Sequence, residues 1–515
     1  SMQVLLENAR IYRTADDPRP ASVLLADCGR VTYVGDDPSA YGRLGPNAER
    51  RDLGGATVVP GLADAHLHLA WIAEGLSEVD TELPALAEAL AAVRAHAQGL
   101  PEGAWLVGYG WNHHAWGGEW PTAALLDAVS AGHPAILAAK SGHAAWVNTA
   151  ALALAGITAA TPDPAGGQIV RASDGSPNGI LLETAAEAVY RVIPPTPPAL
   201  RLAAMRKALS HLAGLGFTCV HDMDGAKSFA ELQALDAAGE LPLRIVHQLR
   251  EQELEGALAM GLRSGFGSER LMIGALKLFM DGALGARTAW MLAPYEGEAS
   301  YAGMSAADPA AVREAIRRAN AGGIACAVHA IGDRAVRQLL DDFEQVGSRA
   351  LRNRIEHLQC IDRDDLPRLG ALNLAASMQP LHASSDRLMA ERHWGARCAA
   401  SYAWRTVAHS GAVLALGSDC PVETADPLRG LYAARTRRNA EGEGSWYPAE
   451  CLSAAEALRG YSWGPAWAAG QEHWLGTLQP GMAVDATILS GDPLTCPPAE
   501  LLEMRVLGTL VGATG

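Results

Sequence analysis

Hydrophobic and polar positions alternate in two different ways along the chain. From Ala199 onward, short apolar runs are followed by Ala-, Leu-, Glu- and Arg-rich stretches with helical periodicity. The apolar runs are FTCVHDM, LRIVHQL, LMIGALKLFM, IACAVHA, RIEHLQ, LNLAASM and VLALGSD. Continuous apolar strands separated by helices are typical of a parallel sheet that is buried on both faces. This part of the chain is therefore predicted to consist of repeated β/α units.

A further apolar strand precedes these units in the sequence. It is VVPGLADAHLHLA at residues 58–70, and it brings the total to eight. Eight parallel strands with helical crossovers favour a closed barrel over an open sheet. The predicted fold class is α/β, with a TIM-like (β/α)8 barrel formed by residues 58–80 and 199–467.

The two ends of the chain have the other pattern. Short β-type runs with turn signals between them occur in the first sixty residues (VLLENARIY, SVLLADC and RVTYVGD) and near the C-terminus (DATILSG and MRVLGTLVG). Such runs are typical of small antiparallel sheets. We expect residues 2–57 and 468–515 to form one composite β-sandwich domain.

Residues 81–198 are not needed by a minimal barrel and are predicted to be an insertion after strand one that covers the active-site mouth. The chain has 13 tryptophans and only 5 phenylalanines. Five of the tryptophans lie in this segment: Trp105, Trp111, Trp116, Trp120 and Trp146. We expect Trp111, Trp116 or Trp146 to line an apolar substrate pocket.

Composition narrows the class of partner. The 515 residues carry 41 Lys and Arg against 57 Asp and Glu, a net charge of −16, which is not the basic footprint of a nucleic-acid binder. No apolar run approaches the roughly 18 residues of a membrane span, and no secretory signal is visible. The eight cysteines are scattered without a C-x-x-C pair. We expect a cytoplasmic protein that acts on a small molecule and binds neither nucleic acid nor membrane.

The first candidate for chemistry is His66-Leu67-His68 at the end of the first barrel strand. Residues two apart on a strand point to the same side, so both imidazoles could bind one metal ion. The alternative is two ordinary histidines, one of them packed in the core. Asp64 just before them could orient a ligand histidine or cap a turn.

Other strand ends carry the same kind of residue. Lys277 lies on strand four, His329 ends strand five, His357 ends strand six and Asp419 ends strand eight. The C-terminal ends of parallel barrel strands meet at one rim, where barrel active sites lie. Buried structural histidines would have to explain each position separately, so the set favours a metal site.

These motifs resemble a known family. PGLADAHLH, the strand-four lysine, AVHAIGD, RIEHLQ and GSDCPV are similar to the amidohydrolase superfamily. KLFMDGALGARTA, SGHAAWVNTAAL and GTLQPGMAVDATIL resemble its amidohydrolase-3 branch, the relatives of N-substituted formamide deformylase. The resemblance covers essentially the whole chain. It implies a metal-dependent barrel with a composite β domain, and a homodimer as the family-level expectation.

The resemblance also implies roles for the candidate residues. His66 and His68 would bind one ion, which Asp419 completes, and His329 and His357 would bind the second. Asp419 would also be the catalytic base. The expected ions are two Zn²⁺, with Mn²⁺ or Fe²⁺ as alternatives.

Lys277 matches the position of a carboxylated lysine that bridges two ions in binuclear members. An ammonium repels cations and has no lone pair, whereas its carbamate offers two anionic oxygens. The alternative is an ion pair of Lys277 with Asp281 or Glu356.

The resemblance implies a hydrolase of carbon–nitrogen bonds other than peptide bonds, acting on an N-acyl or N-formyl amide through a metal-activated hydroxide. One alternative is a mononuclear aminohydrolase (a deaminase) that uses the same histidines without a bridging lysine. The other is a non-catalytic barrel relative. Arg287, Trp111 and His143 are the candidate substrate-binding residues; a surface salt bridge is the alternative for Arg287, and a polar loop position is the alternative for His143.

Overall fold

The computed structural model describes residues 3–438 and 444–512 and divides into two compact units. Unit 1 comprises residues 1–70 and 205–515, and unit 2 comprises residues 71–204. The boundaries fall within α1 (Leu69–Ser77) and α6 (Pro198–Gly214). Met2 and residues 513–515, at the ends of the predicted β domain, lie outside the described residues.

Unit 1 contains an eight-stranded parallel sheet whose strands follow one another in sequence order. The strands are β7 (Leu62–Leu67), β14 (Phe217–Asp222), β15 (Arg244–Arg250), β16 (Leu271–Phe279), β17 (Cys326–Ala330), β18 (Arg354–His357), β19 (Ala375–Met378) and β20 (Val413–Leu416). Each neighbouring pair is parallel. The predicted (β/α)8 barrel is confirmed.

The barrel closes between its first and last strands, next to the candidate ligands. Leu67 forms a parallel bridge with Cys420. The Asp419 N–H donates to the His66 carbonyl at 2.8 Å, and the His68 N–H donates to the Cys420 carbonyl at 3.0 Å. Backbone hydrogen bonds of the barrel therefore fix the His-Leu-His segment against the segment that carries Asp419.

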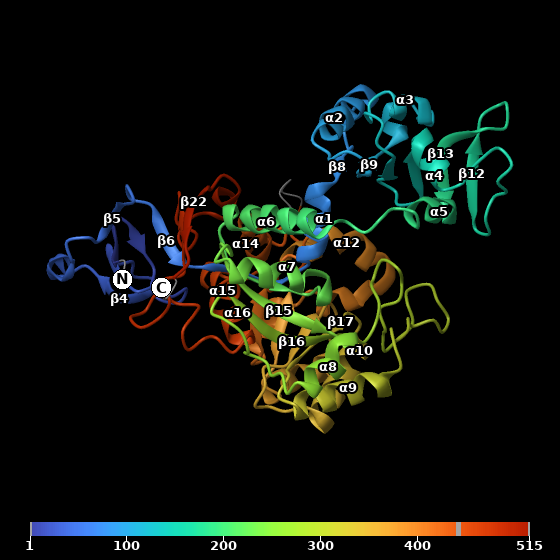
Figure 1. Ribbon diagram of the computed structural model, residues 1–515. Helices are drawn as coiled ribbons and strands as arrows, with labels where there is room; N and C mark the ends of the chain where they lie inside the picture. Colours follow the sequence, from blue (N-terminus) through green and yellow to red (C-terminus); the bar gives the residue numbers. More distant parts are fainter. Residues whose placement is uncertain (1–2, 439–443, 513–515) are drawn as a thin grey trace. The chain divides into compact units, whose positions relative to one another are not determined.

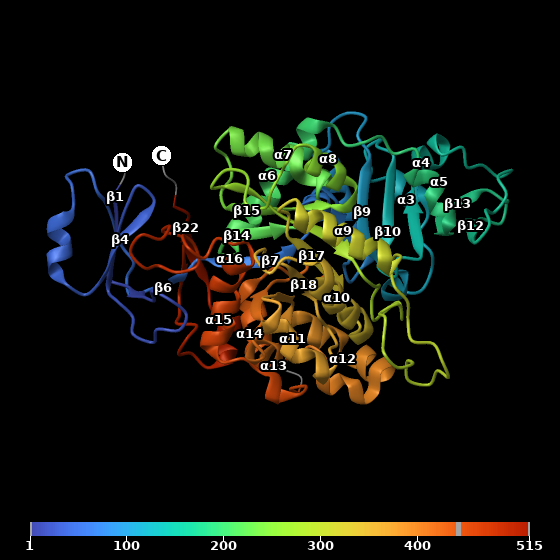
Figure 2. The same ribbon diagram turned by 90° about the horizontal axis from the view of Figure 1, so that it is seen from below.

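Helices connect the barrel strands and lie outside them (Figures 1 and 2). Amphipathic α10 illustrates the pattern, because its buried residues Ala335, Val336, Leu339, Leu340 and Phe343 repeat at helical spacing. The helices of unit 1 after α6 are α7 (Ala226–Ala237), α8 (Leu254–Ala259), α9 (Pro309–Ala321), α10 (Asp333–Val346), α11 (Leu366–Ala371), α12 (Pro380–Trp394), α13 (Trp404–His409), α14 (Pro427–Thr436), α15 (Ala454–Gly460) and α16 (Trp463–Ala468).

Both ends of the chain contribute to a second part of unit 1, which confirms the composite β-sandwich. One sheet has the order β4-β3-β1-β5 and the other β2-β6-β21-β22. Leu6, Leu24, Val58 and Ile488 belong to one apolar cluster shared by the two sheets. The strands are β1 (Gln3–Glu7), β2 (Arg10–Ile11), β3 (Val23–Asp27), β4 (Arg30–Gly35), β5 (Glu49–Asp52), β6 (Thr57–Pro60), β21 (Ala486–Leu489) and β22 (Val506–Leu510).

The predicted first barrel strand at 58–70 is in fact two strands. β6 pairs with β21 in the β-sandwich, and β7 pairs with β14 in the barrel. Gly61 separates them, and a Cβ at this position would lie 2.1 Å from Thr218 Oγ1. A glycine is therefore required where the chain passes from one sheet to the other.

Unit 2 is built on a six-stranded mixed sheet of order β12-β13-β11-β10-β9-β8 (Figure 2). Its elements are β8 (Val79–Asp80), α2 (Leu86–Gln98), β9 (Leu106–Trp111), α3 (Ala123–Asp127), β10 (Ala135–Ala139), β11 (Ala144–Val147), α4 (Thr149–Leu154), β12 (Gly167–Arg171), β13 (Pro177–Glu183) and α5 (Glu187–Tyr190). The predicted insertion, 81–198, lies within this unit, which follows β7 in the chain. Among the described residues, no helix combines the length and apolar character needed to cross a membrane.

Candidate metal centre

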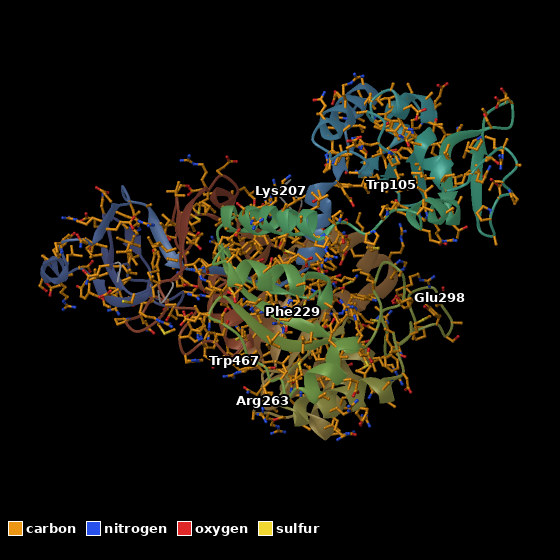
Figure 3. The ribbon with its side chains drawn as sticks, viewed as in Figure 1. Trp105, Lys207, Phe229, Arg263, Glu298 and Trp467 are labelled. Carbon is orange, nitrogen blue, oxygen red and sulfur yellow. The ribbon has the colours of Figure 1, made fainter. Side chains whose placement is uncertain are left out.

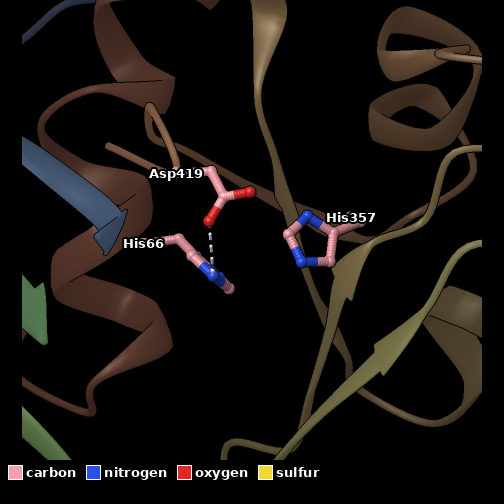
Figure 4. A group of neighbouring side chains, drawn as sticks. All are labelled: His66, His357 and Asp419. Carbon is pink, nitrogen blue, oxygen red and sulfur yellow. Dashed lines mark ion pairs between the residues drawn. The ribbon is translucent and has the colours of Figure 1, made fainter. Parts of the chain in front are cut away.

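Three predicted ligands come together where barrel strands end. His66, His357 and Asp419 offer ligand atoms that all lie within 4.8 Å of one another (Figure 4). Asp419 Oδ1 lies 3.3 Å from His66 Nε2 and 3.2 Å from His68 Nε2. β7 supplies His66, β18 supplies His357, and the segment after β20 supplies Asp419. One carboxylate oxygen therefore faces both histidines of the His-Leu-His segment.

Three histidines of this group, His66, His68 and His357, each have one ring nitrogen hydrogen-bonded to an acceptor. Nδ1 donates at 2.8 Å in every case, from His66 to Glu356, from His68 to Asp224 and from His357 to the Gln379 side chain. Such hydrogen bonds fix the tautomer and ring orientation of metal-binding histidines. They leave Nε2 of all three rings as the nitrogen that can bind a metal.

In His329 the hydrogen-bonded ring nitrogen is Nε2 instead of Nδ1. Its Nε2 donates to the Gly282 carbonyl at 2.6 Å, so Nδ1 is left as its ligand atom. The ring centroids of His329 and His357 are 4.7 Å apart, and those of His357 and His66 are also 4.7 Å apart. His357 thus lies between His329 and the group that contains Asp419.

Lys277, on β16, is 2% exposed, and its Nζ lies 3.7 Å from the centroid of the Phe279 ring. The pKa of this amine is lowered to about 7, mainly by burial; the nearby Glu356 opposes the shift and the nearby Arg250 adds to it. A buried lysine with a depressed pKa has a fraction of neutral amine at physiological pH. This is the form that can react with CO₂.

The two carboxylates considered as ion-pair partners of Lys277 accept hydrogen bonds from other groups. Asp281 accepts the backbone N–H groups of Trp290, Ile331 and Gly332. Glu356 accepts from Arg354 and His66. Within residues 3–438 and 444–512, neither forms an ion pair with Lys277.

Asp419 and the histidines around it shift one another's pKa values. Burial alone would raise the pKa of Asp419, but hydrogen bonds from His382, His66 and His68 hold this pKa well below its usual value. Burial alone would lower the pKa of His68, but Asp224 and Asp419 raise it to about 9. Buried imidazole nitrogens beside ionised carboxylates are a donor set that suits Zn²⁺, Mn²⁺ or Fe²⁺. The residues present therefore fit a divalent metal site.

Sequence reasoning missed His382, which lies on α12. Its Nε2 is 3.2 Å from Asp419 Oδ2, and its Nδ1 is 3.5 Å from Glu423 Oε1. Burial would lower the pKa of His382, but these two carboxylates raise it to about 10. The available signal was a histidine shortly after the seventh strand, in SMQPLHA. Asp224, Glu356 and Gln379 were missed as the partners that orient the ligand histidines.

Two of the candidate ligands have a positive backbone φ angle. His357 has φ 75° and Asp419 has φ 58°. Non-glycine residues in this left-handed region are uncommon and persist where the surrounding structure fixes them, often at functional sites. Asp64 helps to fix this region: its carboxylate accepts the His66 N–H at 3.0 Å and both the N–H and the hydroxyl of Ser418.

The two polar residues predicted to bind substrate each have a carboxylate partner. Arg287 forms an ion pair with Glu298, which lies on the loop between β16 and α9 (Figure 3), and the Arg287 carbonyl accepts from the Tyr301 hydroxyl. His143, in unit 2, has an exposed side chain whose Nδ1 is 3.0 Å from Glu183. Their roles in substrate binding stay predictions.

The tryptophans predicted to line a pocket pack and form hydrogen bonds within unit 2. Trp111 and Trp146 are fully buried in one apolar cluster. The indole N–H of Trp111 donates to the Leu137 carbonyl at 2.7 Å, and that of Trp146 donates to the Thr122 carbonyl at 2.8 Å. Trp116 is half-buried against the same cluster. These contacts give Trp111 and Trp146 a structural role, and a substrate pocket formed by them stays a prediction.

Comparison with known proteins places these residues in context. The sequence model of the amidohydrolase family matches residues 49–513. The protein LONG AFTER FAR-RED 3 of Arabidopsis thaliana is 32% identical over 509 residues, 95% of this chain and 87% of that protein. N-substituted formamide deformylase of Arthrobacter pascens is 30% identical over 531 residues, 99% of this chain and 97% of that enzyme. The crystal structure of an uncharacterized metal-dependent hydrolase from Pyrococcus furiosus superposes with a TM-score of 0.80 at 29% identity, covering 96% of this chain and 100% of that one.

Proposed function

Since the chain belongs to the amidohydrolase family, we propose that it hydrolyses a carbon–nitrogen bond other than a peptide bond, in an N-acyl or N-formyl amide. One observation carries the proposal. Three histidines have Nδ1 fixed by an acceptor, so that Nε2 is left to bind a metal, and two of these Nε2 atoms lie within 3.3 Å of Asp419 Oδ1. This arrangement supports a metal-dependent hydrolase over a packed core.

The metal ligands divide into two groups in this proposal. His66, His68 and Asp419 would hold one ion, and His329 and His357 would hold the second. Lys277, as its carbamate, would help to hold both ions. The burial of Lys277 and the engagement of Asp281 and Glu356 with other groups support this assignment. Divalent ions bound here would lower the pKa of a water molecule toward neutrality and would polarise a carbonyl oxygen.

The residues of the chain then supply the proton transfers. Asp419 Oδ1 faces His66 and His68, so Oδ2 is the oxygen that we assign to proton transfer. It would take a proton from the attacking water and deliver it to the leaving nitrogen, which departs as an amine. His382 Nε2, 3.2 Å from Oδ2, orients this oxygen. His382 is therefore a positioning residue in the proposed mechanism.

The relatives support the substrate class and the metal dependence. The similar enzyme from Arthrobacter pascens is a deformylase of N-substituted formamides, and the similar Pyrococcus furiosus protein is described as a metal-dependent hydrolase.

The eight cysteines are all free thiols, which supports the cytoplasmic compartment that we propose.

The test is an activity screen of the metal-loaded protein. Protein reconstituted with Zn²⁺, Mn²⁺ or Fe²⁺ is assayed against N-formyl, N-acetyl and cyclic amides, with release of amine as the readout. We expect turnover of at least one class, lost on chelation and in Asp419→Asn. The matched control Asp364→Asn changes an exposed carboxylate and should retain activity. Metal binding without turnover of any amide would contradict the proposal.

A further inference from the structure

Arg250, an arginine that the sequence analysis did not single out, lies beside one of the candidate metal ligands. Arg250 is the last residue of β15 and is the register partner of Lys277 on β16. Its guanidinium carbon lies 5.1 Å from the centroid of the Phe279 ring, the ring that Lys277 Nζ approaches at 3.7 Å. Phe279 is 37% exposed. Arg250 thus lies at the same strand ends as the candidate ligands, beside an accessible aromatic ring.

The side chain of Arg250 is held in place by its surroundings. Nη1 donates to the Met223 carbonyl at 3.3 Å. The aliphatic stem lies against Gly225, where a Cβ would be 2.4 Å from Arg250 Cγ. Gly225 has φ 55°, so this close approach and the backbone conformation both require a glycine. The hydrogen bond to Met223 and the contact with Gly225 therefore fix the Arg250 side chain at the ends of the barrel strands.

The charge of Arg250 has no carboxylate partner among the residues that the structure describes. Glu253 lies three residues further along the chain, but its oxygens accept the backbone N–H groups of Arg250 and Ala226. Arg287 differs, because Glu298 neutralises it. Arg250 is half-buried, and one hydrogen bond to a carbonyl leaves most of its five N–H donors unused. An arginine fixed in this way can bind an anionic group in a planar, bidentate manner.

We propose that Arg250 binds a carboxylate of the substrate, so that the enzyme prefers amides that also carry a free carboxylate. This inference rests on the proposed hydrolase function and specifies its substrate class. The guanidinium provides the positive charge, and the exposed part of Phe279 provides an apolar surface next to it. Arg250 is then the specificity-determining residue for this carboxylate, and the prediction for Arg287 is tested beside it.

The experiment compares matched pairs of amides. Each pair has the same formyl, acetyl or propionyl group on glycine or on glycinamide, so one member carries a free carboxylate and the other a neutral carboxamide in its place. The ratio of kcat/KM for the acid to that for the amide is measured with the full-length metal-loaded protein. Calorimetric binding of each member gives a second ratio that does not depend on turnover. The variants are Arg250→Gln, Arg287→Gln and the exposed control Arg206→Gln.

We expect the wild-type protein to favour the acid, and Arg250→Gln to reduce the ratio by about ten- to hundredfold, the range for one charge-assisted hydrogen-bonded pair. Arg206→Gln should leave the ratio unchanged, since this arginine pairs with Glu240 on the surface. Equal binding and turnover of acid and amide would overturn the inference. So would a ratio that survives in Arg250→Gln and falls in Arg287→Gln. Tighter binding of the acid without hydrolysis of any pair would support Arg250 and would contradict the proposed hydrolase instead.

Discussion

Glu356 Oε1 lies 2.8 Å from His66 Nδ1, and the same carboxylate accepts two hydrogen bonds from Arg354. Arg354 also donates to His221 Nδ1 at 2.8 Å and to the Ala65 carbonyl at 2.6 Å. All of these side chains are buried. The orientation of His66 therefore depends on an ion pair inside the barrel, beneath the candidate metal centre.

The first prediction concerns this ion pair. Replacing Arg354 by Met leaves Glu356 buried without its cation, and removing one partner of a buried pair costs about 3–5 kcal/mol of unfolding free energy. Urea unfolding of the wild-type and Arg354→Met proteins measures this loss. The exposed control Arg206→Met should change stability by less than about 0.5 kcal/mol. Equal stability of Arg354→Met and wild type would show that the pair contributes nothing to the barrel.

The second prediction concerns Asp224, which accepts from His68 Nδ1 at 2.8 Å and from the Ala70 N–H at 2.8 Å. Loss of a carboxylate that orients a ligand histidine typically weakens metal binding by about 10–100-fold. Competition with a fluorescent chelator should show this loss in Asp224→Ala. Asp364→Ala, which changes an exposed carboxylate, should bind metal as tightly as wild type. Unchanged affinity in Asp224→Ala would remove His68 from the ligand set.

The third prediction concerns Lys277 and the number of ions. If its carbamate bridges two ions, Lys277→Met should bind about one ion per chain where the wild type binds about two. Metal analysis by mass spectrometry gives the count. Protein loaded in ¹³C-bicarbonate should also show a carbamate carbon signal that the variant lacks. A wild-type protein with about one ion and no carbamate signal would instead favour the mononuclear deaminase alternative.

The fourth prediction separates positioning from metal binding. His382 holds Asp419 Oδ2 at 3.2 Å and is not a candidate ligand. His382→Asn should therefore lower kcat by about 10–100-fold while metal content stays the same. KM should change less than kcat, because the affected oxygen acts in proton transfer. His393→Asn, on the same helix, is the control. Loss of metal from His382→Asn would show that this histidine acts as a ligand or a structural residue.

Much of the barrel could be predicted because its strands are continuous apolar runs. β14 to β20 coincide with the runs that the sequence indicates. The strand ends that carry His329, His357 and Asp419 meet because parallel strands share one rim. The division of residues 58–70 into β6 and β7 was missed. It depends on the contact of Gly61 with Thr218, which is distant in the sequence.

The parts of the site that were missed depend on tertiary contacts. His382 reaches Asp419 from a helix, and the periodicity of α12 does not show which residue approaches the barrel rim. Arg287 belongs to a recognisable motif, but its pairing with Glu298 is a contact within a long loop. Arg250 belongs to no such motif, and its lack of a carboxylate partner emerges only when the neighbours of the described chain are known.

The central claim is that the rim of this barrel binds catalytic metal ions through His66, His68, Lys277, His329, His357 and Asp419. Anomalous X-ray scattering at the zinc absorption edge, from crystals of the zinc-loaded protein, tests it most directly. We expect two adjacent peaks, one contacting His66, His68 and Asp419 and the other contacting His329 and His357, with bridging density extending from Lys277 Nζ. Zinc bound elsewhere, or the absence of a peak at these residues in catalytically competent protein, would contradict the claim.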